Sequence, residues 1–469
     1  MPKNIVICFD GTNNKFGAEN TNVVRLVQLL ERDPLTQRLY YDPGVGTLPE
    51  PGVWSKAGKK LSEIFGLAFG SGLSWKVEEA YSYLMDFWEP GDTVLIFGFS
   101  RGAYSARVLA GMLHALGLLP RGNYNLIPYV MDLYGALRSE HSNAGQWTAL
   151  CDQFRWTFAR LVPGDEEQRH FHVHYLGLWD TVSSIGWVWD PTKYPFTARN
   201  PSLHAARHAI SIDERRWFFR QNRMNASKPG QIEQLWFPGV HSDIGGGYPP
   251  SEGLLWREPF LWILDGAEKA GLRVDEGRRS QVIPQAKADA TATDRKHESL
   301  TGLWWPAEFF PKWRWNSQTQ RNRPDIGLGR FRSIGKGDLL HRSALVRLRT
   351  DSAYRPKNIA PAFVEQLRSL PAVPDTLAYD PGDFRQKYAV GLIVVALLIA
   401  AIIAALGATA LLRSTMWIAE QSNGVCEQGQ ATAPFPTSQP CWDIGASVNN
   451  HGAASALALR LRDVAVDRR

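Results

Sequence analysis

A serine between two glycines is the strongest chemical signal in the sequence. The segment Gly98-Phe-Ser-Arg-Gly102 fits G-x-S-x-G, in which the serine stands on a sharp turn between a strand and a helix. The run 93–97 before it is wholly apolar, as a strand buried on both faces requires, and the periodicity of 103–119 is helical. The glycines let flanking backbone pass close by. We therefore predict that Ser100 is a nucleophile; the alternative is a tight turn with a small residue at a helix N-cap.

A serine hydroxyl is a poor nucleophile until a general base takes its proton, and that base needs a third group to fix its tautomer. In hydrolases of this topology the acid and then the histidine follow the serine along the chain. Asp180 ends one predicted strand, and His241 stands on a glycine-rich loop directly after another. We therefore predict a triad of Ser100, Asp180 and His241. Rival residues are His208 and His341 for the base, and Asp213 and Asp243 for the acid.

A serine hydrolase also needs N–H groups that face the developing oxyanion. The N–H of Arg101, the residue after the nucleophile, is one predicted donor. The polar turn at Gly11 and Thr12, which follows the first predicted strand, is the predicted source of a second. Asp10 beside it is expected to hold that turn, because a carboxylate aimed at an oxyanion would oppose catalysis. Asp243, unless it is the acid, is expected to cap N–H groups of its own loop.

Strands and helices alternate along the chain, which predicts a mostly parallel sheet flanked by helices, an α/β fold of the α/β-hydrolase kind. Predicted strands are 4–9, 37–41, 93–97, 170–179 and 231–237; predicted helices are 21–30, 74–88, 103–119, 124–156, 202–210 and 252–271. Residues 273–330 are predicted to be a polar linker followed by an aromatic cluster. In a parallel sheet the strand ends that carry Asp10, Ser100 and Asp180 meet at one edge.

The carboxy-proximal part of the chain predicts a membrane anchor. Residues 389–412 contain no charged residue, and about 20 apolar residues suffice to span a bilayer. The predicted organisation is a catalytic domain at 1–360, a linker at 361–388, a transmembrane helix at 389–412 and a tail at 413–469. The amino terminus does not resemble a signal peptide, and the tail holds two of the four cysteines, Cys426 and Cys441. We therefore expect a single-pass protein of the bacterial inner membrane with a cytoplasmic catalytic domain and a periplasmic tail, where two cysteines can pair.

The charge and the cysteine and histidine patterns of the sequence argue against nucleic acid, metal ions and cofactors as ligands. The net charge of +6 is mild and the basic residues are scattered, so we predict no nucleic-acid partner. The pattern C-x-x-C is absent. His170, His172 and His174 alternate on one strand face, and strand-face histidines without nearby carboxylates are more often half-exposed than metal ligands, so no metal or cofactor is predicted. The segment 49–72 is a lid, an interfacial segment or a surface loop. The aromatic residues near 304–315 suit a membrane interface or an acyl-chain channel if exposed, and ordinary core if buried.

Four motifs carry a resemblance to a known family. They are C-F-D-G-T-N-N at 8–14, G-F-S-R-G-A-Y-S-A-R at 98–107, G-L-W-D-T-V at 177–182 and W-F-P-G-V-H-S-D-I-G-G-G-Y at 236–248. In this order they resemble the catalytic domain of type VI secretion phospholipase effectors, and H-R-S…Y-R-P-K-N near 341–358 looks like its end. The resemblance implies an α/β-hydrolase fold, esterase or phospholipase A activity, a triad of Ser100, Asp180 and His241, and a secretion-system or immunity partner. The helix at 389–412 is not part of the family's pattern.

The leading hypothesis is a membrane-anchored serine carboxylester hydrolase that acts on phospholipid or another acyl ester through an acyl-enzyme. Two alternatives belong to other classes. One is a metal-dependent phosphoester hydrolase, since Asp10, Asp180, His241 and Asp243 all fall near strand ends. The other is a membrane-anchored binding module without catalysis.

Overall fold

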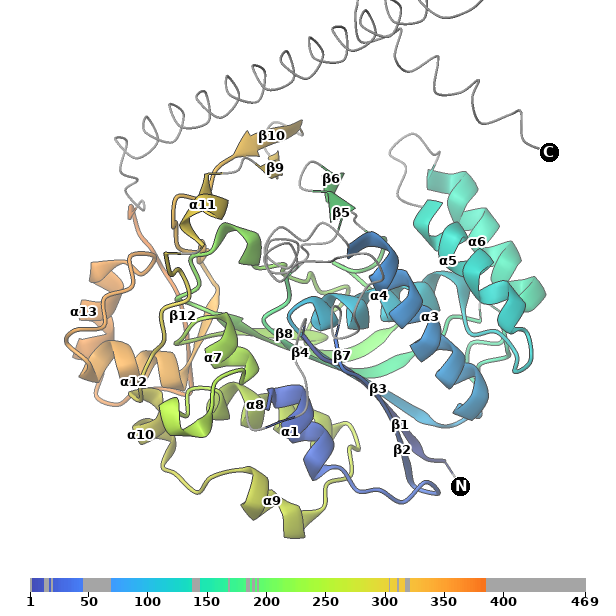
Figure 1. Ribbon diagram of the computed structural model, residues 1–469, viewed down its shortest axis with the longest axis horizontal. Helices are drawn as coiled ribbons and strands as arrows, with labels where there is room; N and C mark the ends of the chain where they lie inside the picture. Colours follow the sequence, from blue (N-terminus) through green and yellow to red (C-terminus); the bar gives the residue numbers. More distant parts are fainter. Residues whose placement is uncertain are drawn as a thin grey trace, which may run out of the picture. The chain divides into compact units, whose positions relative to one another are not determined.

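An eight-stranded sheet forms the centre of the computed structural model, with the strand order β12-β11-β8-β7-β4-β3-β1-β2 (Figure 1). Its strands are β1 (Asn4–Phe9), β2 (Gln37–Asp42), β3 (Thr93–Phe99), β4 (Val173–Trp179), β7 (Leu203–Ser211), β8 (Ile232–Phe237), β11 (Leu339–His341) and β12 (Thr376–Ala378). Neighbouring strands are parallel except for β11 and β12. The predicted mostly parallel α/β fold is therefore confirmed.

The structure describes residues 2–384 with gaps at 12–16, 18–19, 45–68, 137–143, 168, 183–185, 188–189, 192–193, 303, 310–311 and 317–320. The predicted membrane helix at 389–412, the tail with its cysteines and nearly all of the segment 49–72 lie outside these residues. Within them, every helix is too short or too polar to cross a bilayer.

Helices cover both faces of the sheet, because alternate side chains of each strand point to opposite sides. Ile5 and Ile7 of β1 enter the core under α3 (Phe69–Phe87), α4 (Arg101–Leu116), α5 (Ile127–Ala136) and α6 (Ala144–Phe158). Val6 and Cys8 of the same strand enter the core under α1 (Asn22–Leu29) and α8 (Arg257–Lys269). Both faces of β1 are thus buried, as its unbroken apolar sequence predicts.

The remaining elements surround the sheet. They are the α-helices α7 (His241–Gly245), α9 (Glu276–Val282), α10 (Ala288–Ala292), α11 (Trp305–Glu308), α12 (Arg342–Thr350) and α13 (Pro361–Ser369), the 3-10 helices η1 (Tyr124–Leu126), η2 (Trp217–Phe219) and η3 (Pro250–Glu252), and two small antiparallel pairs, β5 (Gly186–Trp187) with β6 (Asp190–Pro191) and β9 (Lys312–Asn316) with β10 (Arg321–Asp325).

Three predicted segments differ from the structure. Residues 202–210, predicted as a helix, form β7, because hydrogen bonding to β4 and β8 on both sides outweighs the helical preference of its alanines. The predicted linker at 273–330 contains α9, α10, α11 and the pair β9–β10. The predicted linker at 361–388 contains α13 and β12, and α13 packs in the same core as Trp236 of β8. The structured unit therefore extends past the predicted boundary at residue 360.

The chain reverses its direction across the sheet between β1 and β3. From β1 it runs outward to β2 and then returns to the other side of β1 as β3. In open parallel sheets, ligands bind outside the carboxyl ends of the strands at such a reversal. Asp10 follows β1 and Ser100 follows β3, so the fold places both predicted site segments at this crevice.

Candidate active site

Ser100 occupies a strained turn between β3 and α4. Its backbone φ of 60° and ψ of −124° lie outside the regions that residues other than glycine usually adopt. The flanking glycines make the turn possible. A Cβ on Gly102 would lie 2.4 Å from the carbonyl oxygen of Asp10, and a Cβ on Gly98 would lie 2.6 Å from the Cα of Ala103. The close backbone passage expected of these glycines is therefore present.

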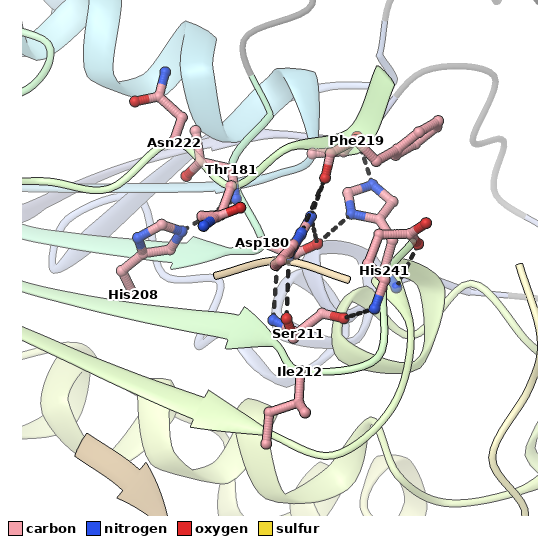
Figure 2. Close-up of polar contacts among 12 residues, drawn as sticks. Asp180, Thr181, His208, Ser211, Ile212, Phe219, Asn222 and His241 are labelled. Carbon is pink, nitrogen blue, oxygen red and sulfur yellow. Dashed lines mark hydrogen bonds and ion pairs between the residues drawn. The ribbon is translucent and has the colours of Figure 1, made fainter. Parts of the chain in front are cut away.

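The structure brings the three residues of the predicted triad together. The Nε2 atom of His241 lies 2.8 Å from the hydroxyl oxygen of Ser100. The Nδ1 atom of the same ring lies 2.6 Å from Oδ2 of Asp180 (Figure 2). All three residues are buried. With Nδ1–H donating to Asp180, Nε2 of the neutral imidazole accepts the serine hydroxyl, which is the arrangement that proton abstraction needs.

Backbone contacts between strand ends hold this arrangement. Asp180 follows β4 with a positive φ of 43°, and its N–H donates to the carbonyl of Ala209 in β7. The N–H of Ser211, at the end of β7, donates to Oδ1 of Asp180 over 2.9 Å. His241 is the first residue of α7, directly after the turn that leaves β8. Ser100 and Asp180 therefore follow two neighbouring strands, β3 and β4, and His241 follows β8, which is separated from β4 by β7.

A buried arginine that the sequence analysis did not identify completes the surroundings of the acid. The guanidinium of Arg332 forms two hydrogen bonds with the carboxylate of Asp180, and its side chain is 1% exposed. It also donates to the carbonyl of Phe219. Arg332 lies in the loop before β11, 152 residues from Asp180, and no motif surrounds it. Only the three-dimensional structure reveals the pair.

A second buried carboxylate supports the histidine from its backbone side. Oε2 of Glu214 accepts the N–H of His241 over 3.1 Å. Glu214 also pairs with the guanidinium of Arg216 and accepts the hydroxyl of Ser299. Burial raises the pKa of the Glu214 carboxyl, but the charge and hydrogen bonds of Arg216, together with the charges of Arg332 and His241, outweigh burial and lower this pKa to about 2. Glu214 is therefore a charged anchor for the backbone of His241, and the sequence analysis missed it.

Neighbouring charges keep the acid ionised and the base neutral. Burial raises the pKa of the Asp180 carboxyl, yet Arg332 and His241 outweigh it and hold this pKa well below the ordinary range. Burial lowers the pKa of His241, and the opposing interaction with Asp180 does not fully restore it. A carboxylate next to a neutral imidazole is the protonation state in which a histidine can accept a proton from a serine hydroxyl.

The rival residues have other partners. His208 lies on β7, where its Nε2 accepts the N–H of Thr181 (Figure 2). His341 caps the first turn of α12, where its Nδ1 accepts the N–H of Ser343. The carboxylate of Asp213 accepts the N–H of Gly239 and the hydroxyl of Tyr354. Asp243 accepts the N–H of Val240 in its own loop, as expected, and also pairs with His297.

The predicted oxyanion donors are arranged differently from the expectation. Arg101 is the first residue of α4, directly after Ser100, so its N–H lies at the helix N-terminus. The N–H of Gly11, however, donates to the side chain of Asp10 over 2.6 Å, so it is engaged within the turn. Asp10 holds the turn as expected, since it also accepts the hydroxyls of Thr21 and Tyr41. Thr12, the other predicted donor, lies outside the described residues.

Aromatic rings enclose the histidine. The rings of Phe99 and Phe219 both lie with their centroids 4.8 Å from that of His241. Trp304, a member of the predicted aromatic cluster, packs edge-on against Phe219, and the guanidinium of Arg216 lies 3.7 Å from the Phe219 ring centroid. This member of the cluster therefore belongs to the surroundings of His241.

The proposed metal ligands do not converge. Within the described ranges, no three side chains of His, Cys, Asp or Glu are placed to hold a metal ion. His170 has a carboxylate near it, contrary to expectation, since its Nδ1 lies 3.2 Å from Asp165. His174 instead accepts the N–H of Val94 through its Nδ1. His170 and His172 thus share Asp165 as a partner, whereas His174 contacts the backbone of β3.

Comparison with known proteins gives one match to a family model. The model for the catalytic domain of the Tle1-like phospholipase effectors of type VI secretion systems matches residues 3–266. The protein YEL023C of Saccharomyces cerevisiae, described as uncharacterized, is 37% identical over 227 residues, which are 47% of this chain and 32% of the yeast protein. The chain thus spans about a third of that relative.

Two solved structures are also similar. An uncharacterized protein from Pseudomonas aeruginosa aligns with a TM-score of 0.37 and 19% identity, over 62% of this chain and 50% of the other. The Tle1 effector bound to the VgrG spike of the type VI secretion system aligns with a TM-score of 0.31 and 22% identity, over 54% of this chain and 53% of the other.

Proposed function

Because the chain belongs to the family of Tle1-like phospholipase effector catalytic domains, we propose that it is a serine hydrolase that cleaves the carboxylic ester bonds of phospholipids. The observation that carries this proposal is the hydrogen-bonded series Ser100–His241–Asp180, with distances of 2.8 Å and 2.6 Å. All three residues fall within the part of the chain that the family model matches. Family membership supports the phospholipase class, and the geometry supports the serine mechanism.

The mechanism follows from the positions of the three side chains. Ser100 attacks the ester carbonyl while Nε2 of His241 takes the hydroxyl proton, and the N–H of Arg101 stabilises the oxyanion. His241 then gives its proton to the leaving alcohol as the acyl–oxygen bond breaks, leaving an acyl-enzyme on Ser100. Water, deprotonated by His241, hydrolyses the acyl-enzyme, and the proton returns to Ser100. Asp180 keeps Nδ1 protonated and stabilises the imidazolium that forms.

The metal-dependent alternative has weaker support. The four residues it requires do not form one set of ligands, because Asp10 turns back to Gly11 and Asp243 pairs with His297. Only Asp180 and His241 of that set are in contact. A two-metal site needs several carboxylate or imidazole ligands directed at one point.

The proposal extends to the location of the enzyme. The uncharged segment 389–412 supports a membrane anchor that brings the catalytic domain close to its lipid substrate, with that domain in the cytoplasm. A secretion-system component or an immunity protein is the partner that the family supports. A variant that ends at residue 384 is expected to lose sedimentation with membranes and to keep hydrolysis of a soluble ester. Membrane sedimentation of that variant would contradict the anchor.

The decisive experiment labels the purified protein with a fluorophosphonate and measures fatty acid release from phospholipid vesicles. The wild type is expected to be labelled and to release fatty acid with EDTA present, and Ser100→Ala is expected to lose both. Ser105→Ala is the matched control, since Ser105 lies on the helix that follows Ser100 and its hydroxyl donates to the carbonyl of Arg101. Full hydrolysis by Ser100→Ala rejects the serine mechanism, and loss of activity in EDTA supports the metal-dependent one. An unlabelled, inactive wild type favours a binding module.

A further inference from the structure

We propose that Arg332 is a positioning residue of the active site, which acts through Asp180 to fix the orientation of His241 and to keep it in its proton-accepting form. This proposal rests on the proposed serine hydrolase function. It also extends the active site beyond residues 3–266, the part of the chain that the family model matches. The supporting observations are the contacts of Arg332, the division of the Asp180 oxygens between partners, and the charges around His241.

The contacts of Arg332 reach the triad by two routes. Its guanidinium donates hydrogen bonds to both oxygens of Asp180 and also to the carbonyl of Phe219. The ring of Phe219 in turn packs edge-on against His241, with the centroids 4.8 Å apart. Arg332 is itself anchored, because Nδ2 of Asn358 donates to its carbonyl over 3.0 Å. One buried cation thus restrains both the partner and the packing surface of the imidazole.

The carboxylate of Asp180 is held so that one oxygen faces the histidine. Oδ2 accepts Nδ1–H of His241, while Oδ1 accepts the N–H of Ser211 and Nη1 of Arg332. A carboxylate fixed at both oxygens cannot rotate away from the imidazole. Such fixation matters because catalytic groups must be held within about 0.5 Å of their productive positions.

Stability alone does not account for this ion pair. Taking two charges out of water costs free energy that their attraction only partly returns, and well-packed apolar residues often stabilise such a site equally well. Arg332 and Asp180 are each 1% exposed, so both bear the full cost of desolvation. The pair is therefore better explained by what it does to the histidine that shares the carboxylate.

The charge of Arg332 affects the proton affinity of the coupled Asp180–His241 pair. The titratable and charged groups that face this pair are Arg332 and His208 on the side of Asp180, and Glu214 with Arg216 beside His241. Removing a positive charge at hydrogen-bond distance raises the proton affinity of the pair, whichever of the two residues takes the proton. In either case, as pH falls, the pair takes up a proton at a higher pH than in the wild type, and His241 then no longer accepts the serine proton.

The test compares Arg332→Met, which removes the charge, with Arg332→Lys, which keeps it and loses the bidentate geometry. The readout is the pH profile of kcat/KM on a soluble ester, together with the rate of fluorophosphonate labelling. For Arg332→Met the acidic limb of the profile is expected to move up by about 1–3 pH units, the effect typical of a neighbouring charge. For Arg332→Lys the limb is expected to stay in place while kcat falls about tenfold or more with KM little changed.

Arg347→Met is the matched control. Arg347 is also buried, and its guanidinium bonds to the carbonyls of Ala292 and Asp294 without contacting the triad. This variant is expected to lower the melting temperature and to leave the acidic limb unmoved. An Arg332→Met enzyme with an unmoved limb, or an equal shift in Arg347→Met, would overturn the proposal.

A double variant covers the case in which Arg332→Met does not fold. Asp180→Asn with Arg332→Met removes both charges, so no uncompensated ion remains in the interior. If Arg332 acts through Asp180, this double variant has the same kcat/KM as Asp180→Asn alone; a further loss of about tenfold would assign the effect of Arg332 to its contact with Phe219 instead and contradicts the proposal. A wild type that neither hydrolyses esters nor reacts with the fluorophosphonate rejects the proposed function, and the role of Arg332 with it. An active wild type with an unmoved limb rejects the role of Arg332 alone.

Discussion

The Nε2 atom of His241 lies 2.8 Å from the hydroxyl oxygen of Ser100, although 141 residues separate the two in the chain. The parallel sheet produces this distance, because β3 and β8 end at the same edge. Phe99 packs against the imidazole and Phe219 packs edge-on against it, so the ring is held in place. The proton therefore has a direct path from the serine to the histidine without any rearrangement of either side chain.

The first prediction concerns the pH dependence of hydrolysis. Burial lowers the pKa of His241 below the ordinary value of about 6.5, and only the neutral ring accepts the proton of Ser100. As pH falls, kcat/KM is therefore expected to stay high through pH 6.5 and to decline only as pH passes the lowered pKa. Measuring kcat/KM on a soluble ester across this range checks the direction. An acidic limb well above pH 6.5 would show that the imidazolium is favoured instead.

Asp180→Asn is expected to damage both catalysis and folding. The amide cannot hold Nδ1–H of His241 in the required tautomer, so kcat is expected to fall by about 10³–10⁴-fold. The same change leaves the buried guanidinium of Arg332 without its counter-charge, which costs about 3–5 kcal/mol of the free energy of unfolding. Ester hydrolysis and urea unfolding measure the two losses separately.

Asp213→Asn is the corresponding test of the rival acid. Burial raises the pKa of Asp213 to about 6, and its carboxylate only accepts hydrogen bonds, from Gly239 and Tyr354. An asparagine oxygen can accept the same bonds without a buried charge. We expect kcat within about tenfold of the wild type and a small change in stability. A loss as large as that of Asp180→Asn would identify Asp213 as the acid.

The parts of the site that local sequence determines were predictable. The apolar run before Ser100 and the glycines around it are properties of neighbouring residues, and they specify the strand, turn and helix found in the structure. His241 was predictable for the same reason, since it follows a strand on a loop rich in glycine. Such signals require no knowledge of the tertiary fold.

The parts that depend on distant partners were not predictable. Arg332 has no local pattern and becomes meaningful only when the fold buries it beside Asp180. Glu214 has a counter-charge close by in sequence, Arg216, but the sequence does not show that Glu214 accepts the N–H of His241. The strand β7 was predicted as a helix because its alanines favour helices locally, whereas its two neighbours in the sheet decide its structure. The turn at Gly11 was found, but the sequence does not show that Asp10 folds back onto its N–H.

A substitution in the serine turn tests the close packing there. In Gly102→Ala, the added methyl group would lie 2.4 Å from the carbonyl oxygens of Phe9 and Asp10, so β1 and α4 would have to separate. We expect a loss of about 1–3 kcal/mol in stability and a large loss of labelling at Ser100. Gly135→Ala in α5 is the control, because no atom of the described residues outside its own stretch of helix backbone lies within 4 Å of an added Cβ. That change is expected to leave labelling intact, and equal effects of both would contradict the packing argument.

His297 links the stability of the α7 region to pH. Its Nδ1 lies 2.6 Å from Asp243 of α7 and its Nε2 lies 3.1 Å from Glu252, so both nitrogens face carboxylates. Both can donate only when the ring is protonated. The hydrogen bond with Asp243 is the largest of the effects that raise the pKa of His297 above its ordinary value.

The last prediction follows from the sign of this shift. A histidine whose pKa is higher in the folded state stabilises the protein fully below about pH 6.5, and this stabilisation is lost as pH rises through the raised pKa. His297→Gln is therefore expected to lower the free energy of unfolding more at about pH 6 than at about pH 9. His341→Gln is the control of opposite sign, since burial lowers the pKa of His341 to about 4 and its protonation opposes folding. Urea unfolding at both pH values measures the differences, and a His297→Gln effect independent of pH would show that the ring is neutral in the folded protein.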